Sequence, residues 1–144
     1  MKRKTKIISV QNFFWYYAPL LIWIGIIWLL SSQEGTLARE APQWSFYVQR
    51  KGAHIVEFFV LTFLFWRVIR LFTKNSLDTL VWTFIWVLWM ATLDESHQSL
   101  VMGREGKVSD VIIDMIGASS ALLIIRGKCF LPKNRLFQKI CKKQ

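Results

Sequence analysis

Seven ionisable residues lie inside the hydrophobic segments of this chain or at their ends. They are Lys51, His54, Glu57, Asp94, Glu95, Asp110 and Asp114. A charged side chain near the centre of a bilayer costs at least about 2.5 kcal/mol, so such residues pair with one another or line a functional polar cavity. We therefore interpret the seven residues as parts of one candidate site.

Helical spacing places the polar residues of each segment on a shared face. The first face carries Lys51, His54 and Glu57, which recur at every third position. The second carries Asp94, His97 and Gln98 at i, i+3 and i+4, and the third carries Asp110 and Asp114 at i and i+4. Glu95 is turned about 100° away from the second face, and Gly117 allows a neighbouring helix to approach the third closely. If the faces meet at one end of a bundle, their side chains converge.

The residue types in this cluster suit proton transfer beside a bound anion. We predict catalytic roles for His54, Glu57, Asp94, Glu95, Asp110 and Asp114, and substrate-binding roles for Lys51, His97, Gln98 and Arg104. Two cations, Lys51 and Arg104, cannot neutralise all of these carboxylates, so some acid is expected to be protonated or to hold a bound cation. Such carboxyl groups are candidate proton donors and acceptors.

Other interpretations of the same residues stay open. The polar groups at the start of the second segment can simply reach the lipid headgroups, and Asp94 and Asp114 can pair with basic residues to hold a bundle together. Imidazole and carboxylate also suit zinc or manganese. The candidate metal ligands are His54, Glu57, Asp94 and His97. No spacing among them is diagnostic, so the sequence determines neither a metal nor a cofactor.

The elements that position these residues are predicted to be membrane-spanning helices. Of the 144 residues, 53% are hydrophobic, and eight Trp and eleven Phe give more apolar surface than one small soluble core can hide. Apolar stretches near the roughly 17–25 residues that cross a bilayer as a helix lie at 13–30, 55–72, 77–93 and 108–125. The alternation of barrel strands is absent. We predict an all-α integral membrane bundle of four helices.

Shorter helices and basic ends are predicted to flank these spans. The connection before the second span carries Pro42, Trp44, Phe46 and Tyr47, which favours an interfacial helix that turns into the membrane at Gly52. Residues 132–143 have the spacing of a helix on the membrane surface, and a flexible basic tail fits them nearly as well. The predicted divisions are a basic N-terminus (1–12), a membrane domain (13–125) and a basic tail (126–144).

The distribution of Lys and Arg predicts that both termini are cytoplasmic. Fourteen of the nineteen basic residues lie in the N-terminus, around the second-to-third connection and in the tail, and the positive-inside rule assigns such segments to the cytoplasm. The polar faces then lie at the outer ends of their helices. Because the net charge of +10 is spread over the cytoplasmic rims, it suits anionic lipid headgroups. We expect the lipid bilayer, and no nucleic acid, as a partner.

The order of the polar residues resembles that of the VanZ-like family. The motifs that carry the resemblance are Ser31-Ser32-Gln33, Lys51-x-x-His54-x-x-Glu57, Asp94-Glu95-Ser96-His97-Gln98, Gly103-Arg104, Ser109-Asp110, Asp114 and Gly117. The pattern covers most of the chain, from about Ser31 to Leu123. Two positions depart from it: Asp114 stands where many relatives have Asn, and Met102 replaces a common Pro before the Gly-Arg pair.

The resemblance implies a small multi-pass protein of the bacterial plasma membrane. It also implies an association with cell-envelope modification and low-level resistance to glycopeptide antibiotics of the teicoplanin type. Together with the polar cluster, it predicts an outward-facing site for an anionic or lipid-linked envelope substrate, whose anion is held by Lys51 and Arg104. The alternative is a non-catalytic membrane module whose polar cluster only holds the bundle together or docks a partner.

Overall fold

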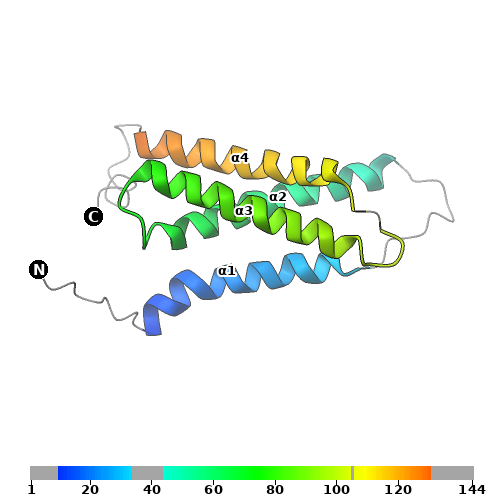
Figure 1. Ribbon diagram of the computed structural model, residues 1–144, viewed down its shortest axis with the longest axis horizontal. Helices are drawn as coiled ribbons and strands as arrows, with labels where there is room; N and C mark the ends of the chain where they lie inside the picture. The colour runs from blue at the N-terminus through cyan, green and yellow to red at the C-terminus, as the bar shows by residue number, and fades with distance from the viewer. Residues whose placement is uncertain (1–9, 34–43, 105, 131–144) are drawn as a thin grey trace, which may run out of the picture.

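The computed structural model describes residues 10–33, 44–104 and 106–130, which form four long helices (Figure 1). The helices are α1 (Val10–Ser31), α2 (Trp44–Ile69), α3 (Ser76–Gln98) and α4 (Val108–Phe130). No strand occurs within these ranges. The predicted all-α fold with four helical spans is confirmed.

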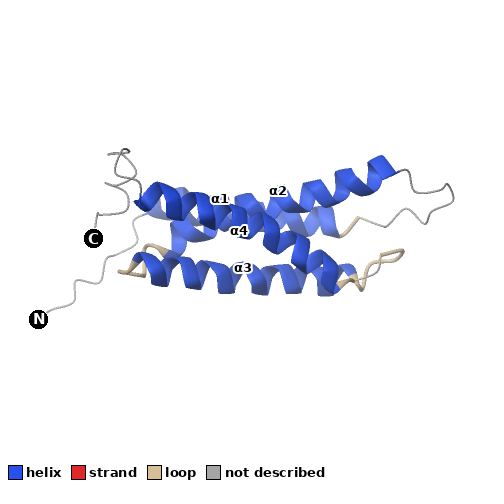
Figure 2. Cartoon of the chain, turned by 90° about the horizontal axis from the view of Figure 1, so that it is seen from above, coloured by secondary structure: helices blue, strands red, loops and turns tan. Residues whose placement is uncertain are grey.

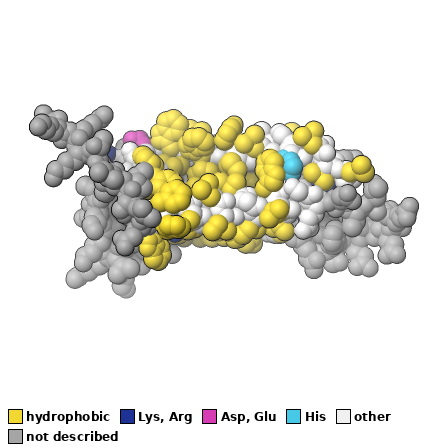
Figure 3. Space-filling model, turned by 90° about the horizontal axis from the view of Figure 1, so that it is seen from below, with side chains coloured by type: hydrophobic (Ala, Val, Ile, Leu, Met, Phe, Trp, Pro, Cys, Tyr) yellow, Lys and Arg dark blue, Asp and Glu magenta, His cyan; other side chains and the backbone are white. Residues whose placement is uncertain are grey.

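Each helix contains a stretch that is long and apolar enough to cross a membrane. The stretches are Phe13–Ser31, Arg50–Ile69, Ser76–Gln98 and Val108–Gly127. Large hydrophobic side chains are exposed on every helix, and Figure 3 shows them spread over one face of the described part of the molecule. An apolar surface of this extent suits hydrocarbon better than water. The fold is therefore that of a multi-pass membrane protein in contact with lipid.

The helices form an up-and-down bundle around α2. α2 packs against each of the other three helices, and most extensively against α4. α3 packs on α2 and α4, and α1 lies beside α2 and α3. Successive helices run in opposite directions (Figure 1 and Figure 2), so the beginning of α1 and the end of α4 lie at the same end of the bundle. The cytoplasmic location of that end stays a prediction.

The second helix differs from its prediction. α2 begins at Trp44 and continues without a break through Gly52, so the predicted change of direction at Gly52 is wrong. Gly52 is exposed, and nothing lies near the position of a Cβ atom there; the regular helical hydrogen bonding simply continues. A 26-residue helix is roughly 39 Å long, so its first turns extend beyond a hydrocarbon core of about 30 Å. The predicted surface helix at 132–143 lies outside the described residues.

A proline inside α1 is compensated by a side chain of α2. Pro19 has no N–H, so the carbonyl of Trp15, four residues earlier, loses its helical hydrogen bond. The Arg67 guanidinium donates to that carbonyl from Nη2 at 2.8 Å. Because Trp15 lies near the start of α1 and Arg67 near the end of α2, the contact joins the two helices at the end of the bundle remote from the polar residues.

α4 approaches α2 closely at Gly117. A Cβ atom at this position would collide with the main-chain carbonyl of Ile55 in α2. Ala118 and Ala121 continue the small-residue face of α4, and both are almost completely buried, as small residues at the interfaces of membrane helices commonly are. The close approach that the sequence predicts at Gly117 is confirmed.

Replacing Gly117 by Ala is expected to destabilise the bundle, because the new methyl group meets backbone atoms and not a flexible side chain. Overpacking of this kind costs about 1–3 kcal/mol. Gly127→Ala in the same helix is the matched control, because nothing lies within 4 Å of a Cβ atom there, and it should be neutral or gain up to about 1 kcal/mol. Thermal unfolding in detergent compares the two; equal midpoints would contradict the close approach.

Candidate functional site

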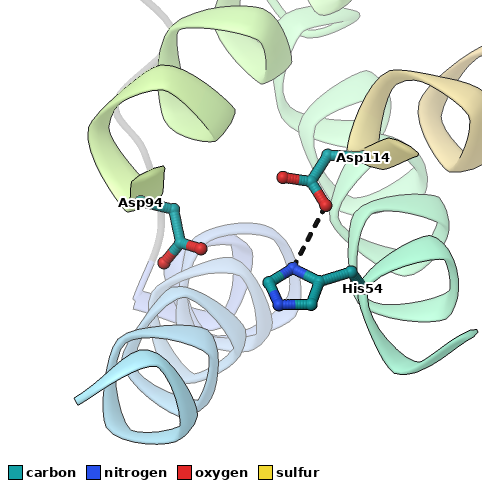
Figure 4. A group of neighbouring side chains, drawn as sticks. All are labelled: His54, Asp94 and Asp114. Atoms are coloured by element: carbon teal, nitrogen blue, oxygen red, sulfur yellow. Dashed lines mark hydrogen bonds and ion pairs between the residues drawn. The ribbon is translucent and has the colours of Figure 1, made fainter. Parts of the chain in front are cut away.

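Three buried side chains meet near the ends of α1 and α3, beside the first half of α2 and of α4. His54 of α2, Asp94 of α3 and Asp114 of α4 each offer one nitrogen or oxygen atom, and these atoms lie within 4.8 Å of one another. Figure 4 shows the imidazole and both carboxylates pointing into one shared space. We call these three residues the buried trio. The structure thus brings together three of the predicted catalytic residues, and their catalytic role stays a prediction.

Asp94 is held by donors from two helices. The Ser31 hydroxyl at the end of α1 donates to Oδ1 at 2.5 Å, and the Gln98 amide, one turn along α3, donates to Oδ2 at 2.7 Å. All three side chains are buried: the exposed fraction is 2% for Ser31, 3% for Asp94 and 1% for Gln98. Two donors to one carboxylate fix its orientation. The hydrogen bond confirms that Asp94 and Gln98 share a helix face.

His54 and Asp114 join α2 to α4. His54 Nδ1 lies 3.1 Å from Asp114 Oδ1. Asp114 is completely buried, and its second oxygen, Oδ2, has no hydrogen-bond partner among the described residues. A buried polar atom without a partner is unfavourable by about 1–3 kcal/mol, and by more when it is charged. Oδ2 of Asp114 is therefore the least satisfied atom of the buried trio.

Two further acids surround the buried trio without joining it. Glu57, one turn after His54, is partly exposed and lies within electrostatic reach of two trio members and of Arg104. Glu95 is buried, and its Oε1 accepts the main-chain N–H of Lys107 in the α3–α4 connection at 2.5 Å. The other oxygen of Glu95 has no partner in the part of the chain that the structure describes. Glu95 therefore fixes the connection, whereas Glu57 interacts with the trio through its charge.

Three other predicted residues lie around the buried trio and not within it. Lys51 of α2 and Asp110 of α4 form an ion pair. His97 is partly exposed and stacks on Trp28 of α1 with ring centroids 4.0 Å apart, while its Nε2 lies 2.9 Å from the Ser32 hydroxyl oxygen. The first pair ties α2 to α4, and His97 belongs to the contact between α1 and α3.

Two arginines lie beside the same cluster. Arg104 Nη2 donates to the carbonyl of Leu30 at 3.2 Å, and the buried Nε of Arg104 has no partner within the described ranges. Arg50 Nη2 lies 3.5 Å from Gln98 Oε1. Burial, together with the like charge of Arg50, lowers the pKa of Arg104. The carboxylates of Asp94, Glu95 and Glu57 also lie within electrostatic reach of Arg104, and their negative charge opposes this lowering.

The sequence prediction omits Ser31, Arg50 and Trp28 from the site. Ser31 belongs to a motif of the family resemblance, but only the packing of α1 against α3 brings its hydroxyl to Asp94. Arg50 falls in the segment predicted to be an interfacial helix; because α2 is continuous, Arg50 lies on the same helix as His54. Trp28 gives no signal of its own, since aromatic residues are common along all the spans.

The fold and the cluster define a multi-pass helical membrane protein with a buried polar site between its helices. The VanZ/LLP1 family model matches residues 13–131, which is most of the chain. The protein belongs to this VanZ-like family, which is linked to teicoplanin resistance. No curated protein and no solved structure matches the chain.

Proposed function

We propose that this VanZ-like protein binds an anionic, lipid-linked substrate of the cell envelope at the buried trio and its neighbouring arginines, on the outer side of the membrane. The substrate class is a lipid-borne phosphate, such as a carrier-linked polymer precursor, which reaches the site laterally from the bilayer. Resistance to teicoplanin then follows from an altered envelope.

The observation that carries this proposal is the pair of arginines. Arg50 and Arg104 lie within electrostatic reach of each other, and both are partly buried. Arg104 has a buried Nε without a partner among the described residues. An anion between two guanidinium groups relieves their repulsion, and guanidinium matches the geometry of phosphate. Because Lys51 is paired with Asp110, Arg50 takes the anion-binding role that the sequence favours for Lys51.

Proton transfer is the chemistry that the adjacent residues can supply. The imidazole of His54 contacts Asp114 and interacts electrostatically with Glu57 and Asp94. A histidine whose ring is oriented by a carboxylate is a common general base. In this proposal His54, with Glu57 or Asp94, accepts and returns a proton next to the bound phosphate.

The outward orientation of the site rests on the basic residues at the other end of the bundle. Arg67 and Arg126 lie at the ends of α2 and α4 remote from the buried trio, where the positive-inside rule expects the cytoplasm. Green fluorescent protein fused after Gln144 should therefore fluoresce, and alkaline phosphatase fused there should be inactive, because its disulfides form only outside the cytoplasm. Fusions within 34–43 should give the opposite pattern; an active phosphatase after Gln144 would contradict the orientation.

A second function is favoured by the fact that the polar contacts join different helices. Lys51 and Asp110 join α2 to α4, and Ser31 and Asp94 join α1 to α3. In this candidate the cluster only organises the bundle, or it docks a partner, and no substrate enters. Interhelical polar contacts of this kind stabilise membrane proteins by about 0.6 kcal/mol on average.

Single substitutions separate the two candidates. The variants are His54→Ala, Glu57→Gln, Asp94→Asn and Arg104→Ala, each expressed in a teicoplanin-susceptible bacterium in which the wild-type gene confers resistance. We expect each to return the minimal inhibitory concentration to that of cells without the gene, because the anion or the proton is no longer held. Arg126→Ala, an exposed position at the other end of α4, is the matched control and should keep wild-type resistance.

Membrane accumulation and folding in detergent complete this experiment. Site variants that accumulate and fold normally but lose resistance support substrate binding. Unfolding of every site variant supports the purely structural candidate. Full resistance with normally folded Arg104→Ala would contradict the anion site.

A further inference from the structure

The geometry of the buried trio is close to that of a metal site, and its side chains would draw together by about 1 Å to bind an ion. Three ligand atoms, one from each of three helices, lie within 4.8 Å of one another. Ligands bound to zinc at about 2.0–2.2 Å lie roughly 3–3.6 Å apart in a tetrahedral arrangement. The 3.1 Å separation of His54 Nδ1 and Asp114 Oδ1 therefore fits two ligands of one ion as well as it fits a hydrogen bond.

An unsatisfied oxygen points to the same place. Asp114 is completely buried, and its Oδ2 has no hydrogen-bond partner among the described residues. In Figure 4 the carboxylate of Asp114 points toward Asp94 and His54. A cation that the Asp114 carboxylate binds through both oxygens would give Oδ2 a partner and remove the cost of burying it unpaired.

The surroundings of Asp94 resemble the outer shell of a metal site. Metal-binding carboxylates are commonly oriented by hydrogen bonds from a second layer of residues. Ser31 and Gln98 donate one hydrogen bond to each oxygen of Asp94. Each carboxylate oxygen keeps a further lone pair for coordination. Ser31 and Gln98 are therefore positioning residues for Asp94.

The balance of charge also favours a dication. Two buried carboxylates, Asp94 and Asp114, face one imidazole, while Glu57 and Glu95 add negative charge within electrostatic reach of His54. Arg104 lies within electrostatic reach of Asp94, Glu57 and Glu95, but one guanidinium cannot balance four carboxylates. Burial of several carboxylates is stable only when positive charge or protons compensate them. A divalent ion bound to neutral His54 compensates both trio carboxylates at once.

We propose that His54, Asp94 and Asp114 bind one divalent transition-metal ion, with zinc as the reference ion. One imidazole nitrogen and two carboxylate groups form a ligand set that zinc and manganese accept. Three protein ligands leave at least one coordination position for water or for a substrate oxygen, as in catalytic zinc sites. The ion binds without substrate, so this inference does not depend on the proposed function. With the ion bound, the imidazole lone pair of His54 is used in coordination, and Glu57 takes the proton-accepting role.

Metal content and a cobalt spectrum test the site. The full-length, tag-free protein in detergent is stripped with chelator, loaded with Zn²⁺ or Co²⁺, separated from free ion by gel filtration and analysed by mass spectrometry of the elements. We expect about one ion per chain, and visible absorption bands from Co²⁺ held by nitrogen and oxygen ligands. His54→Ala and Asp114→Asn should lose most of the ion, and Ser31→Ala should weaken affinity about 10–100-fold.

His97→Ala is the matched control, because His97 is the other histidine of this two-histidine chain and stacks on Trp28 outside the trio. It should keep the ion and the cobalt bands. Wild-type protein that holds no stoichiometric Zn²⁺ or Co²⁺ would overturn the proposal, whatever the variants do. An equal loss in His97→Ala and Asp114→Asn, with both folded by circular dichroism, would also overturn it. If His54→Ala fails to fold, the nearly isosteric Asp114→Asn provides the comparison.

Discussion

The burial of two carboxylates between apolar helices is the constraint on which the rest of this structure depends. Asp94 is 3% exposed and Asp114 is not exposed at all, and uncompensated charge at such positions is unfavourable by several kcal/mol. Each carboxylate therefore needs partners from another helix. Ser31 of α1 reaches Asp94, and His54 of α2 reaches Asp114. These contacts join α1 to α3 and α2 to α4 at one end of the bundle.

Helix packing and the polar contacts depend on each other. Gly117 lies one turn after Asp114, and Ile55 follows His54 directly, so the close approach of α4 to α2 also sets the distance between the imidazole and the carboxylate. A larger residue at position 117 would separate the helices and draw His54 away from Asp114. A site made from three helices is precise only if the backbones that carry it are held this closely.

Much of the fold could be predicted from the sequence, because membrane-spanning helices are encoded by local composition. Helical spacing also placed His54, Asp94 and Asp114 on faces that can meet. Spacing gives no distance between helices, however, so it could not separate these three residues from His97, which stacks on α1 instead. The continuity of α2 through Gly52 was missed because glycine signals a turn only where the surrounding packing uses its freedom. The side of the membrane on which the cluster lies rests on charge distribution alone.

The dependence of the bundle on its buried carboxylates is tested most directly by a double-mutant cycle between Ser31 and Asp94. The free energy of unfolding in detergent is measured for wild type, Ser31→Ala, Asp94→Ala and the double variant. A parallel control cycle uses Ser32→Ala in place of Ser31→Ala, because Ser32 is the exposed neighbour of Ser31. Because the acceptor is a buried carboxylate, the expected coupling free energy for Ser31 is about 1 kcal/mol or more, above the average for interhelical contacts; for Ser32 additivity is expected. Additivity within about 0.3 kcal/mol in both cycles would contradict the buried contact.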